Sequence, residues 1–231
     1  MSEEAAGAII PAAGLGRRLG GVEKALAELA GKPLVSWAVD IFQRCSQVHR
    51  IALVLRQESL EVGRRLASES GWSKVEVCPG GPRRQDSVLH GLSLLKDCPW
   101  VIVHDGARPL VDEELVRRGL EAARETGAAA AALPVADTIK EVGEDHLVMK
   151  TPERRLLWAV QTPQVFRREL LETAYRQAGA EEATDDASLV ERAGVRVKVY
   201  PGSPWNIKVT TREDLLLAEL LLRERQGQRA P

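Results

Sequence analysis

Short apolar runs alternate with segments of helical periodicity along most of the chain. Continuous apolar runs are typical of parallel strands that are buried on both faces. The expected strands are Ala8–Ala13, Arg50–Leu55, Val75–Cys78, Trp100–His104, Ala128–Pro134 and Val195–Tyr200. The amphipathic stretches expected to form helices are Pro33–Cys45, Ser59–Glu69, Arg83–Leu95, Asp112–Glu125 and Arg167–Gln177. Because strands and helices alternate regularly, the pattern predicts an α/β fold with a mostly parallel sheet covered by helices on both faces.

One segment, at about residues 137–161, departs from this alternation. Its polar and apolar positions alternate around a Gly-Glu-Asp turn, which is the pattern of a β-hairpin. An ordinary edge hairpin is one interpretation. The segment is long, however, and we expect it to be a projecting arm that seeks a partner surface, inserted in a single domain over residues 1–231. Its apolar residues are Leu147, Val148, Leu156, Leu157 and Trp158.

Composition narrows the class of protein. The 231 residues, 44% hydrophobic and 28% charged, fit one soluble α/β domain. The 32 Lys and Arg residues nearly balance the 33 Asp and Glu residues, so no general nucleic-acid binder is expected. No run is long enough for a membrane span, and no signal peptide is seen. Three widely spaced cysteines, Cys45, Cys78 and Cys98, predict reduced thiols in a cytoplasmic protein.

A glycine loop with much positive charge follows the first expected strand. Gly14 and Gly16 permit close approach to a phosphate, and Arg18 and Lys24 follow within a few residues. The third glycine of a dinucleotide-binding motif is missing, and the next strand ends in Arg56 where an acid would hold a ribose. Cations here suit charge that builds up on a phosphorus under attack. Solvated charges beside a turn are the alternative.

Three later segments also place reactive groups where expected strands end. In the segment beginning at Cys78, Gly81 exposes its backbone and Ser87 can hydrogen-bond a base edge. In the segment beginning at Val101, Asp105 can hold Mg²⁺ beside a triphosphate and Arg108 can bind a substrate phosphate, although an Asp–Arg pair closing a turn is the alternative. Lys208 lies in a strand-like run, where a lysine is costly to bury without an anion.

The ordered set of motifs resembles the 2-C-methyl-D-erythritol 4-phosphate cytidylyltransferase family. The segments that carry the resemblance are PAAGLGRRL with Lys24, GGPRRQDSVLHGL, VHDGARP, ADTIK, LWAVQTPQVF, TDDASLVE and SPWNIKVTT. The resemblance implies a Rossmann-like nucleotidyltransferase fold, use of CTP with Mg²⁺ or another divalent cation, and a homodimer clasped by the arm. It implies transfer of CMP from CTP to 2-C-methyl-D-erythritol 4-phosphate, as part of non-mevalonate isoprenoid synthesis.

The same resemblance assigns roles to individual residues. Arg18 and Lys24 match the pair that stabilises the transition state at the α-phosphorus, with Lys208 as a further catalytic contact. The CTP site is matched by Ala12, Ala13, Gly14, Gly81, Ser87 and Asp105. The methylerythritol phosphate site is matched by Asp105, Arg108, Thr138, Arg154, Thr162, Thr184 and Lys208, with Asp105 also on the metal side. Whether Arg154 or its neighbour Arg155 meets the phosphate stays open.

Other functions remain possible at this stage. A cytidylyltransferase for another polyol phosphate, such as ribitol 5-phosphate, would share the fold and the CTP motifs. An NADP-dependent reductase would explain Arg56 and the glycine loop but gives Lys24 and Lys208 no role. A non-catalytic nucleotide sensor would not need the full set of charges. In a 2-C-methyl-D-erythritol 4-phosphate cytidylyltransferase, the substrate phosphate itself would attack the α-phosphorus of CTP in line. Catalysis would then rest on positioning and charge neutralisation.

Overall fold

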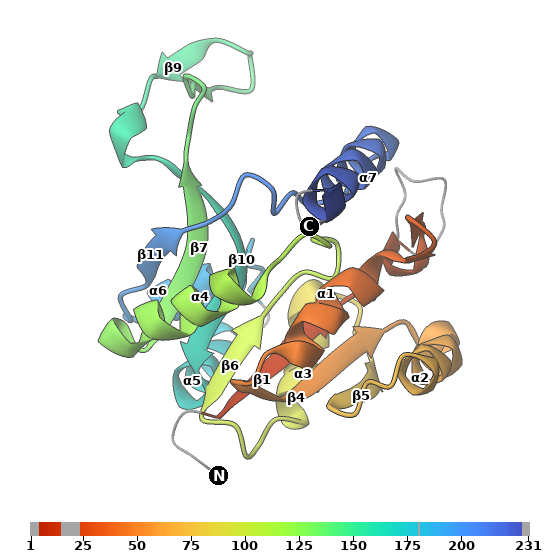
Figure 1. Cartoon of the computed structure of the whole chain (residues 1–231). Helices are drawn as coiled ribbons and strands as arrows, with labels where there is room; N and C mark the ends of the chain where they lie inside the picture. The colour runs from red at the N-terminus through yellow and green to blue at the C-terminus, as the bar shows by residue number, and fades with distance from the viewer. Residues whose placement is uncertain (1–4, 15–23, 180, 228–231) are drawn as a thin grey trace.

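The computed structural model describes residues 5–14, 24–179 and 181–227 and is built around one seven-stranded sheet (Figure 1). The strand order is β11-β7-β10-β6-β1-β4-β5. All of these strands run parallel to one another except β10 (Trp158–Arg167), which is antiparallel to both of its neighbours. The others are β1 (Ala6–Pro11), β4 (Val48–Leu55), β5 (Val75–Pro79), β6 (Trp100–Val103), β7 (Ala128–Pro134) and β11 (Lys198–Pro201).

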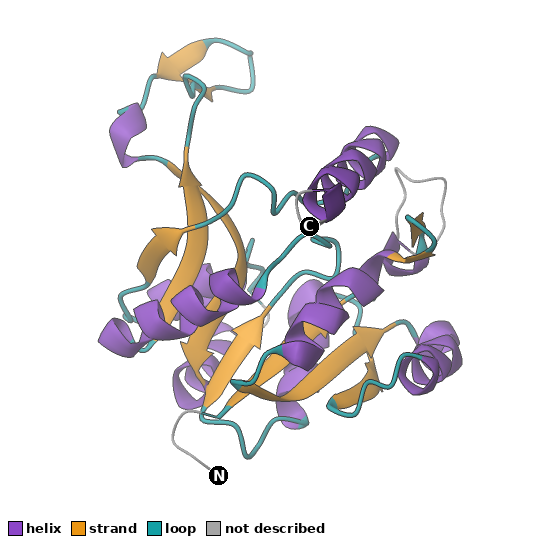
Figure 2. Cartoon of the chain, viewed as in Figure 1, coloured by secondary structure: helices purple, strands orange, loops and turns teal. Residues whose placement is uncertain are grey.

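Helices cover both faces of this sheet, so the expected fold class is confirmed (Figure 2). One face packs against α1 (Leu34–Arg44), α2 (Leu60–Glu69) and α4 (Glu113–Thr126). The other packs against α3 (Arg84–Ser93), α5 (Arg168–Ala178) and α6 (Asp186–Arg192). Successive side chains of a strand point to opposite faces, as Ile9 and Ile10 of β1 do here, which is why the buried strands are apolar throughout.

Three segments depart from the sequence-based expectation. The first residues of β10 were expected within the hairpin, but the strand continues beyond it, and its inner half is buried between β6 and β7. The helix α6 was not among the expected helices, and Asp185 accepts a hydrogen bond from Ser188 N as its N-cap. The segment with Lys208 was expected to be strand-like and is instead an extended loop before α7 (Arg212–Gly227).

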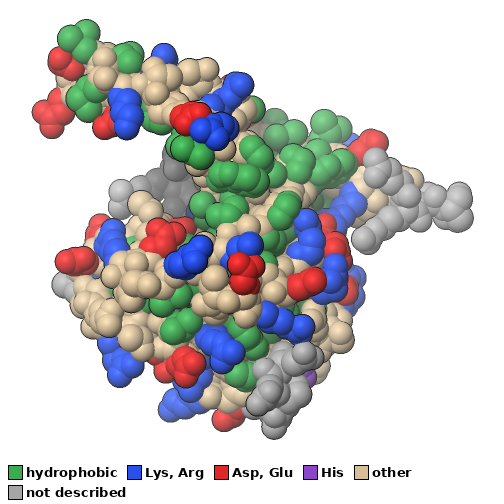
Figure 3. Space-filling model, turned by 90° about the vertical axis from the view of Figure 1, so that its left-hand side faces the viewer, with side chains coloured by type: hydrophobic (Ala, Val, Ile, Leu, Met, Phe, Trp, Pro, Cys, Tyr) green, Lys and Arg blue, Asp and Glu red, His purple; other side chains and the backbone are tan. Residues whose placement is uncertain are grey.

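The segment between β7 and β10 stands out from the body. It contains the short strands β8 (Glu141–Val142) and β9 (Val148–Lys150) and a 3-10 turn, η4 (Arg154–Leu156). Figure 3 shows hydrophobic side chains on this arm and beneath it. The exposed large hydrophobic residues of the arm and its base are Ile139, Val142, Leu147, Val148, Met149, Leu156, Trp158 and Val160.

The cysteines are buried in the body of the protein. The thiols of Cys45, Cys78 and Cys98 are free and buried, as expected from their spacing. None of the helices in the described part of the chain is long and apolar enough to cross a membrane. The short strands β2 (Glu28–Leu29) and β3 (Lys32–Pro33) and the 3-10 turns η2 (Lys24–Leu26) and η3 (Gln57–Ser59) complete the fold.

Candidate active site

A cavity of about 210 Å³ lies where the parallel strands β1, β5 and β6 end. Four segments far apart in the sequence line it: the loop after β1, the loop between β5 and α3, the loop after β6, and the segment that precedes α7. Carboxyl ends of parallel strands meet at one edge of a sheet, and loops gather there to form a ligand site. The sequence-predicted residues that line the cavity are Ala12, Ala13, Gly14, Gly81, Ser87, Asp105 and Lys208.

The two glycine loops approach each other closely. A Cβ atom at Gly80 would lie 2.5 Å from the Cβ of Ala13, so only glycine allows the observed spacing. Next to it, Gly81 N donates to Ser87 Oγ at 3.1 Å, and the Ser87 hydroxyl donates to the Arg83 carbonyl at 3.3 Å. The hydroxyl proton of Ser87 is therefore used within the loop, and what Ser87 retains for a ligand is a lone pair.

Asp105 is the carboxylate of the cavity and is surrounded by cations. Its Oδ1 lies 3.2 Å from both Nε and Nη2 of Arg84, and its Oδ2 lies 2.7 Å from Lys208 Nζ and 4.0 Å from Arg108 Nε. Burial alone would raise the pKa of the Asp105 carboxyl, but Arg84, Lys208 and Arg108 together hold it well below its usual value. Asp105 is therefore charged at any physiological pH.

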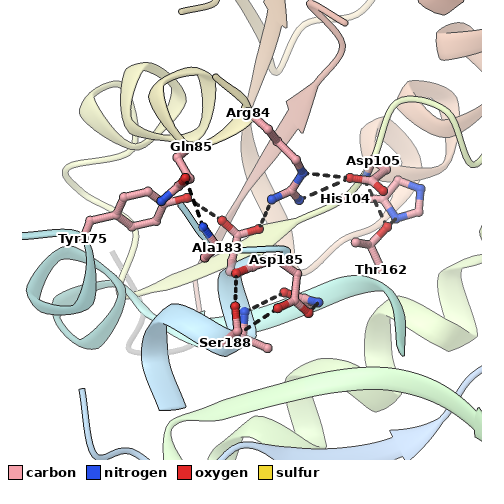
Figure 4. Close-up of polar contacts among 12 residues, drawn as sticks. Arg84, Gln85, His104, Asp105, Thr162, Tyr175, Ala183, Asp185 and Ser188 are labelled. Carbon is pink, nitrogen blue, oxygen red and sulfur yellow. Dashed lines mark hydrogen bonds and ion pairs between the residues drawn. The ribbon is translucent and has the colours of Figure 1, made fainter. Parts of the chain in front are cut away.

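The backbone of Asp105 is held by a buried chain of hydrogen bonds (Figure 4). The Asp105 N–H donates to Thr162 Oγ1 at 3.0 Å, and Thr162 Oγ1 lies 3.2 Å from His104 Nδ1. His104 Nε2 lies 3.0 Å from the Arg108 carbonyl, which can only accept, so Nε2 carries the proton. The Thr162 hydroxyl then donates to Nδ1. Burial lowers the pKa of His104 to about 4, which keeps the imidazole neutral.

Arg108 retains an unused donor beside Asp105. Its Nη1 donates to the Asn206 carbonyl at 2.7 Å, but its buried Nε–H has no hydrogen-bond acceptor among the described residues. Burial lowers the pKa of the Arg108 guanidinium, because charge is costly to bury. A buried N–H without an acceptor is unfavourable, and the Asp105 carboxylate 4.0 Å away compensates this group only by its charge.

The segment that carries Lys208 is tied to the loop after β6. Val209 N donates to the Ala107 carbonyl at 2.8 Å, and the Asn206 amide donates to the Thr162 carbonyl at 2.7 Å. Asn206 is fully buried. These bonds place Lys208 Nζ against Asp105, although the side chain stays 43% exposed toward the cavity. Sequence reasoning did not identify Asn206, whose only signal was its place inside the SPWNIK motif.

The candidates of the described part of the chain that do not line the cavity are Arg108, Thr138, Arg154, Thr162 and Thr184. Thr138 and Arg154 are exposed on the arm, where Arg154 Nη1 donates to the Ala136 carbonyl at 2.8 Å and Arg155 pairs with Glu153. Thr184 is exposed in the loop before α6. Arg18 and Gly16 lie outside the described residues. The backbone of Lys24 begins η2, directly before Ala25 of the cavity wall.

The position of the Arg84 side chain could not be predicted from the sequence, because Arg83 and Arg84 are adjacent residues of the same type. Arg83 pairs with Asp86 of its own helix at 2.7 Å. Arg84 lies between Asp105 and the fully buried Asp186. Burial alone would lower the pKa of Arg84, but the two carboxylates outweigh it and raise the pKa above its usual value.

Known proteins are similar to this chain in sequence and in fold over nearly its whole length. The family model for 2-C-methyl-D-erythritol 4-phosphate cytidylyltransferase matches residues 6–224. Proteins of that name from Dehalococcoides mccartyi and Caldanaerobacter subterraneus are 49% and 43% identical, covering 96% and 94% of this chain and 97% and 98% of their own lengths.

Solved structures agree with this assignment. The 4-diphosphocytidyl-2C-methyl-D-erythritol synthase of Anaerococcus prevotii superposes with a TM-score of 0.86 at 30% identity, covering 96% of this chain and 97% of its own. The 2-C-methyl-D-erythritol 4-phosphate cytidylyltransferase of Thermus thermophilus gives 0.77 at 33% identity, covering 95% and 99%. The extent of both comparisons confirms the resemblance seen in the motifs, and this chain belongs to the 2-C-methyl-D-erythritol 4-phosphate cytidylyltransferase family.

Proposed function

We propose that this cytidylyltransferase transfers CMP from CTP to 2-C-methyl-D-erythritol 4-phosphate in the cavity around Asp105, with release of pyrophosphate. The observation that carries the proposal is the meeting of both glycine loops, Asp105 and Lys208 around one cavity. The products are pyrophosphate and 4-diphosphocytidyl-2-C-methyl-D-erythritol. Membership of the family supports the reaction, and the cavity supplies a place for it.

The base of CTP is proposed to bind beside Ser87. Since the Ser87 proton is directed to the Arg83 carbonyl, the hydroxyl offers a lone pair. The 4-amino group of cytosine can donate to that lone pair, whereas uracil presents a carbonyl oxygen there. Ala12, Ala13, Gly14 and Gly81 complete the cradle with their backbones. This arrangement favours CTP over UTP, and the space between the loops favours a pyrimidine over a purine.

The transfer step needs no nucleophile from the protein. A phosphate oxygen of the substrate attacks the α-phosphorus of CTP in line, a new P–O bond forms, and the bond to pyrophosphate breaks with its electrons on the leaving oxygen. Negative charge spreads over the α-phosphate as this happens. We assign its stabilisation to Arg18 and Lys24, and assign Lys208 to holding the substrate phosphate near the α-phosphorus.

Among the described residues, one carboxylate of the cavity could take part in holding a divalent cation. Asp105 is the only carboxylate of the described residues that line the cavity, and no group of three or more His, Cys, Asp or Glu side chains that could hold a metal occurs among the described residues. Mg²⁺ commonly binds through one or two carboxylates together with phosphate oxygens. Asp105 would therefore hold it jointly with the nucleotide, where Mg²⁺ neutralises charge on the phosphates.

The methylerythritol phosphate is proposed to lie between Asp105, Arg108 and Thr184. The unused Nε–H of Arg108 supports a contact with an oxygen of the substrate. The hydroxyl of Thr162 is already shared between Asp105 and His104, so its part is to hold Asp105 in place and to offer at most a lone pair. Thr138 and Arg154, on the arm, complete the site only if a second subunit brings them there.

A homodimer is therefore part of the proposal. The arm of the single domain bears a row of exposed apolar side chains, and apolar surface of this kind is typical of a protein interface. In such a dimer Arg154 of one subunit would reach the substrate phosphate of the other. Free, buried cysteines support a reducing compartment, and we place the enzyme in the cytoplasm.

Pyrophosphate release tests the function directly. The purified protein is incubated with Mg²⁺, CTP or UTP, and either 2-C-methyl-D-erythritol 4-phosphate or ribitol 5-phosphate. We expect turnover with CTP and methylerythritol phosphate and a much lower kcat/KM with UTP. Comparable kcat/KM for the two nucleotides would contradict the role of Ser87. Faster turnover of ribitol 5-phosphate than of methylerythritol phosphate would show that the chain is a cytidylyltransferase with a different substrate.

A further inference from the structure

We propose that Arg84 is a positioning residue that ties the nucleotide half of the site to the substrate half, by joining Asp105 to the loop that carries Thr184. Arg84 begins α3, the helix that also bears Ser87, and its side chain lines the cavity. Its guanidinium donates in two directions: Nε and Nη2 meet Asp105 Oδ1, and Nη1 meets Asp186 Oδ2 at 2.7 Å (Figure 4).

Asp186 is a firm anchor for this link. Its side chain is fully buried, and its other oxygen accepts a hydrogen bond from the hydroxyl of Tyr175 on α5. A buried carboxylate without a partner is strongly unfavourable, so the ion pair with Arg84 is held in place by the burial itself. Arg84 is thus pinned at its far end and presents its remaining N–H groups to Asp105.

The loop that precedes Asp186, with the first turn of α6, is held by several further hydrogen bonds. Gln85 donates to the Glu181 carbonyl at 3.0 Å and accepts from Ala183 N at 3.3 Å. Gln164 of β10 donates to Asp185 Oδ2 at 2.7 Å and accepts from Ala187 N at 2.9 Å. Thr184 is exposed and lies between the bonded residues Ala183 and Asp185.

As a consequence, one helix positions the groups proposed to bind both ligands. Helix α3 supplies Ser87 to the nucleotide, Arg84 to Asp105, and both Arg84 and Gln85 to the Thr184 loop. Loss of the Arg84–Asp186 pair would remove one of the contacts that hold that loop, and would free Arg84 to turn fully toward Asp105. The inference rests on the proposed function in one respect, which is that Thr184 contacts the methylerythritol phosphate.

The first test compares Asp186→Asn with Tyr175→Phe. The first substitution removes the charge that Arg84 binds, and the second removes a neutral hydrogen bond to the same carboxylate on the side away from the cavity. We expect Asp186→Asn to raise the KM for methylerythritol phosphate on the order of tenfold, and Tyr175→Phe to change it by less than about twofold. Equal effects of the two variants, or an unchanged KM for Asp186→Asn, would overturn the inference.

The second test is a double-mutant cycle with Thr184→Ala. If Asp186 acts on the substrate through Thr184, Asp186→Asn should raise the KM by less than about twofold in the Thr184→Ala background. A merely destabilising substitution would instead multiply the effect of Thr184→Ala in full, and that result would overturn the inference. Arg84→Lys, which retains the charge but reaches only one carboxylate, should show the same non-additivity and replaces Asp186→Asn if that variant does not fold.

Hydrogen exchange separates the two proposals. Amides of residues 181–188 should exchange faster in Arg84→Lys than in the parent chain, without ligand and regardless of activity. Unchanged exchange there would overturn the clamp even in an active enzyme. A parent chain that releases no pyrophosphate would contradict the proposed function, while faster exchange in the variant would still support the link between Arg84 and the loop.

Discussion

The cavity wall around Asp105 and the arm hold their polar groups in opposite ways. In the wall, His104, Asp105 and Thr162 are buried, and each is hydrogen-bonded within the same chain. On the arm, Thr138 and Arg154 are exposed, and the apolar side chains around them are exposed as well. A buried network fixes its members before any ligand arrives, whereas exposed groups are fixed only by what binds them. The wall is preorganised by one chain, whereas we propose that the arm depends on a second subunit.

The largest effect is expected at Lys24, to which we assigned stabilisation of the transition state. Lys24→Ala should lower kcat by roughly 10²–10³-fold, because it removes that proposed donor. Arg18→Ala should behave similarly. The control is Lys32→Ala, since Lys32 pairs with Asp40 outside this cavity and should leave turnover unchanged. An increase in KM alone, with kcat unchanged, would make Lys24 a simple binding contact.

The dependence of the arm on a second subunit can be tested with mixed dimers. Lys24→Ala and Arg154→Ala are co-expressed, each inactive alone. If Arg154 acts across the dimer, a mixed dimer has one site with both residues intact, and random assembly makes about half of the dimers mixed. Roughly a quarter of all sites should then be active. Mixed dimers confirmed by mass but without activity would show that Arg154 serves its own subunit.

The pH dependence of the free energy of unfolding gives a further comparison, because each region contains a histidine. Burial lowers the pKa of His104 from 6.5 to about 4. Between these two pH values, the unfolded chain therefore binds a proton at this residue that the folded chain does not bind. The free energy of unfolding should therefore fall as the pH drops from about 6.5 to about 4, by roughly 3 kcal/mol from this group, and then level off.

Urea unfolding at several pH values measures this contribution. His104→Asn should remove that part of the slope, whatever it does to the stability at neutral pH. The matched control is His146→Asn on the exposed arm, where asparagine also tolerates the positive φ of residue 146. A slope that His104→Asn leaves unchanged would contradict a neutral, buried His104.

The smallest effect on folding is expected at the tip of the arm. Leu147 is 67% exposed, so Leu147→Ser should change the free energy of unfolding by less than about 0.5 kcal/mol at low protein concentration. The same substitution should weaken the proposed dimer in sedimentation experiments. A large loss of stability in the monomer would mean that the arm is part of the folding unit, as the wall is.

The parallel part of the sheet was predictable because its signals are local. Apolar runs and helical periodicity located β1, β4, β5, β6 and β7 with their helices, within a few residues at each end. The strand β10 was not, because Gln161, Thr162, Pro163 and Gln164 suggest a turn when considered alone. These polar side chains are satisfied by partners from remote segments, such as Asp185 for Gln164 and Ser203 for Gln161. No local pattern contains that information.

The sequence by itself determined which chemistry this protein can support: glycines where loops must approach, an aspartate and a lysine beside them, and motifs whose order indicates the family. Only the tertiary structure decided which charges meet. Arg83 and Arg84 are adjacent and chemically identical, yet Arg83 pairs with Asp86 of its own helix, whereas Arg84 joins Asp105 and Asp186, 21 and 102 positions away. The direction of a side chain from a helix, and the strands that the sheet brings beside it, select such partners, because electrostatic pairing depends on distance in space and not on distance along the chain.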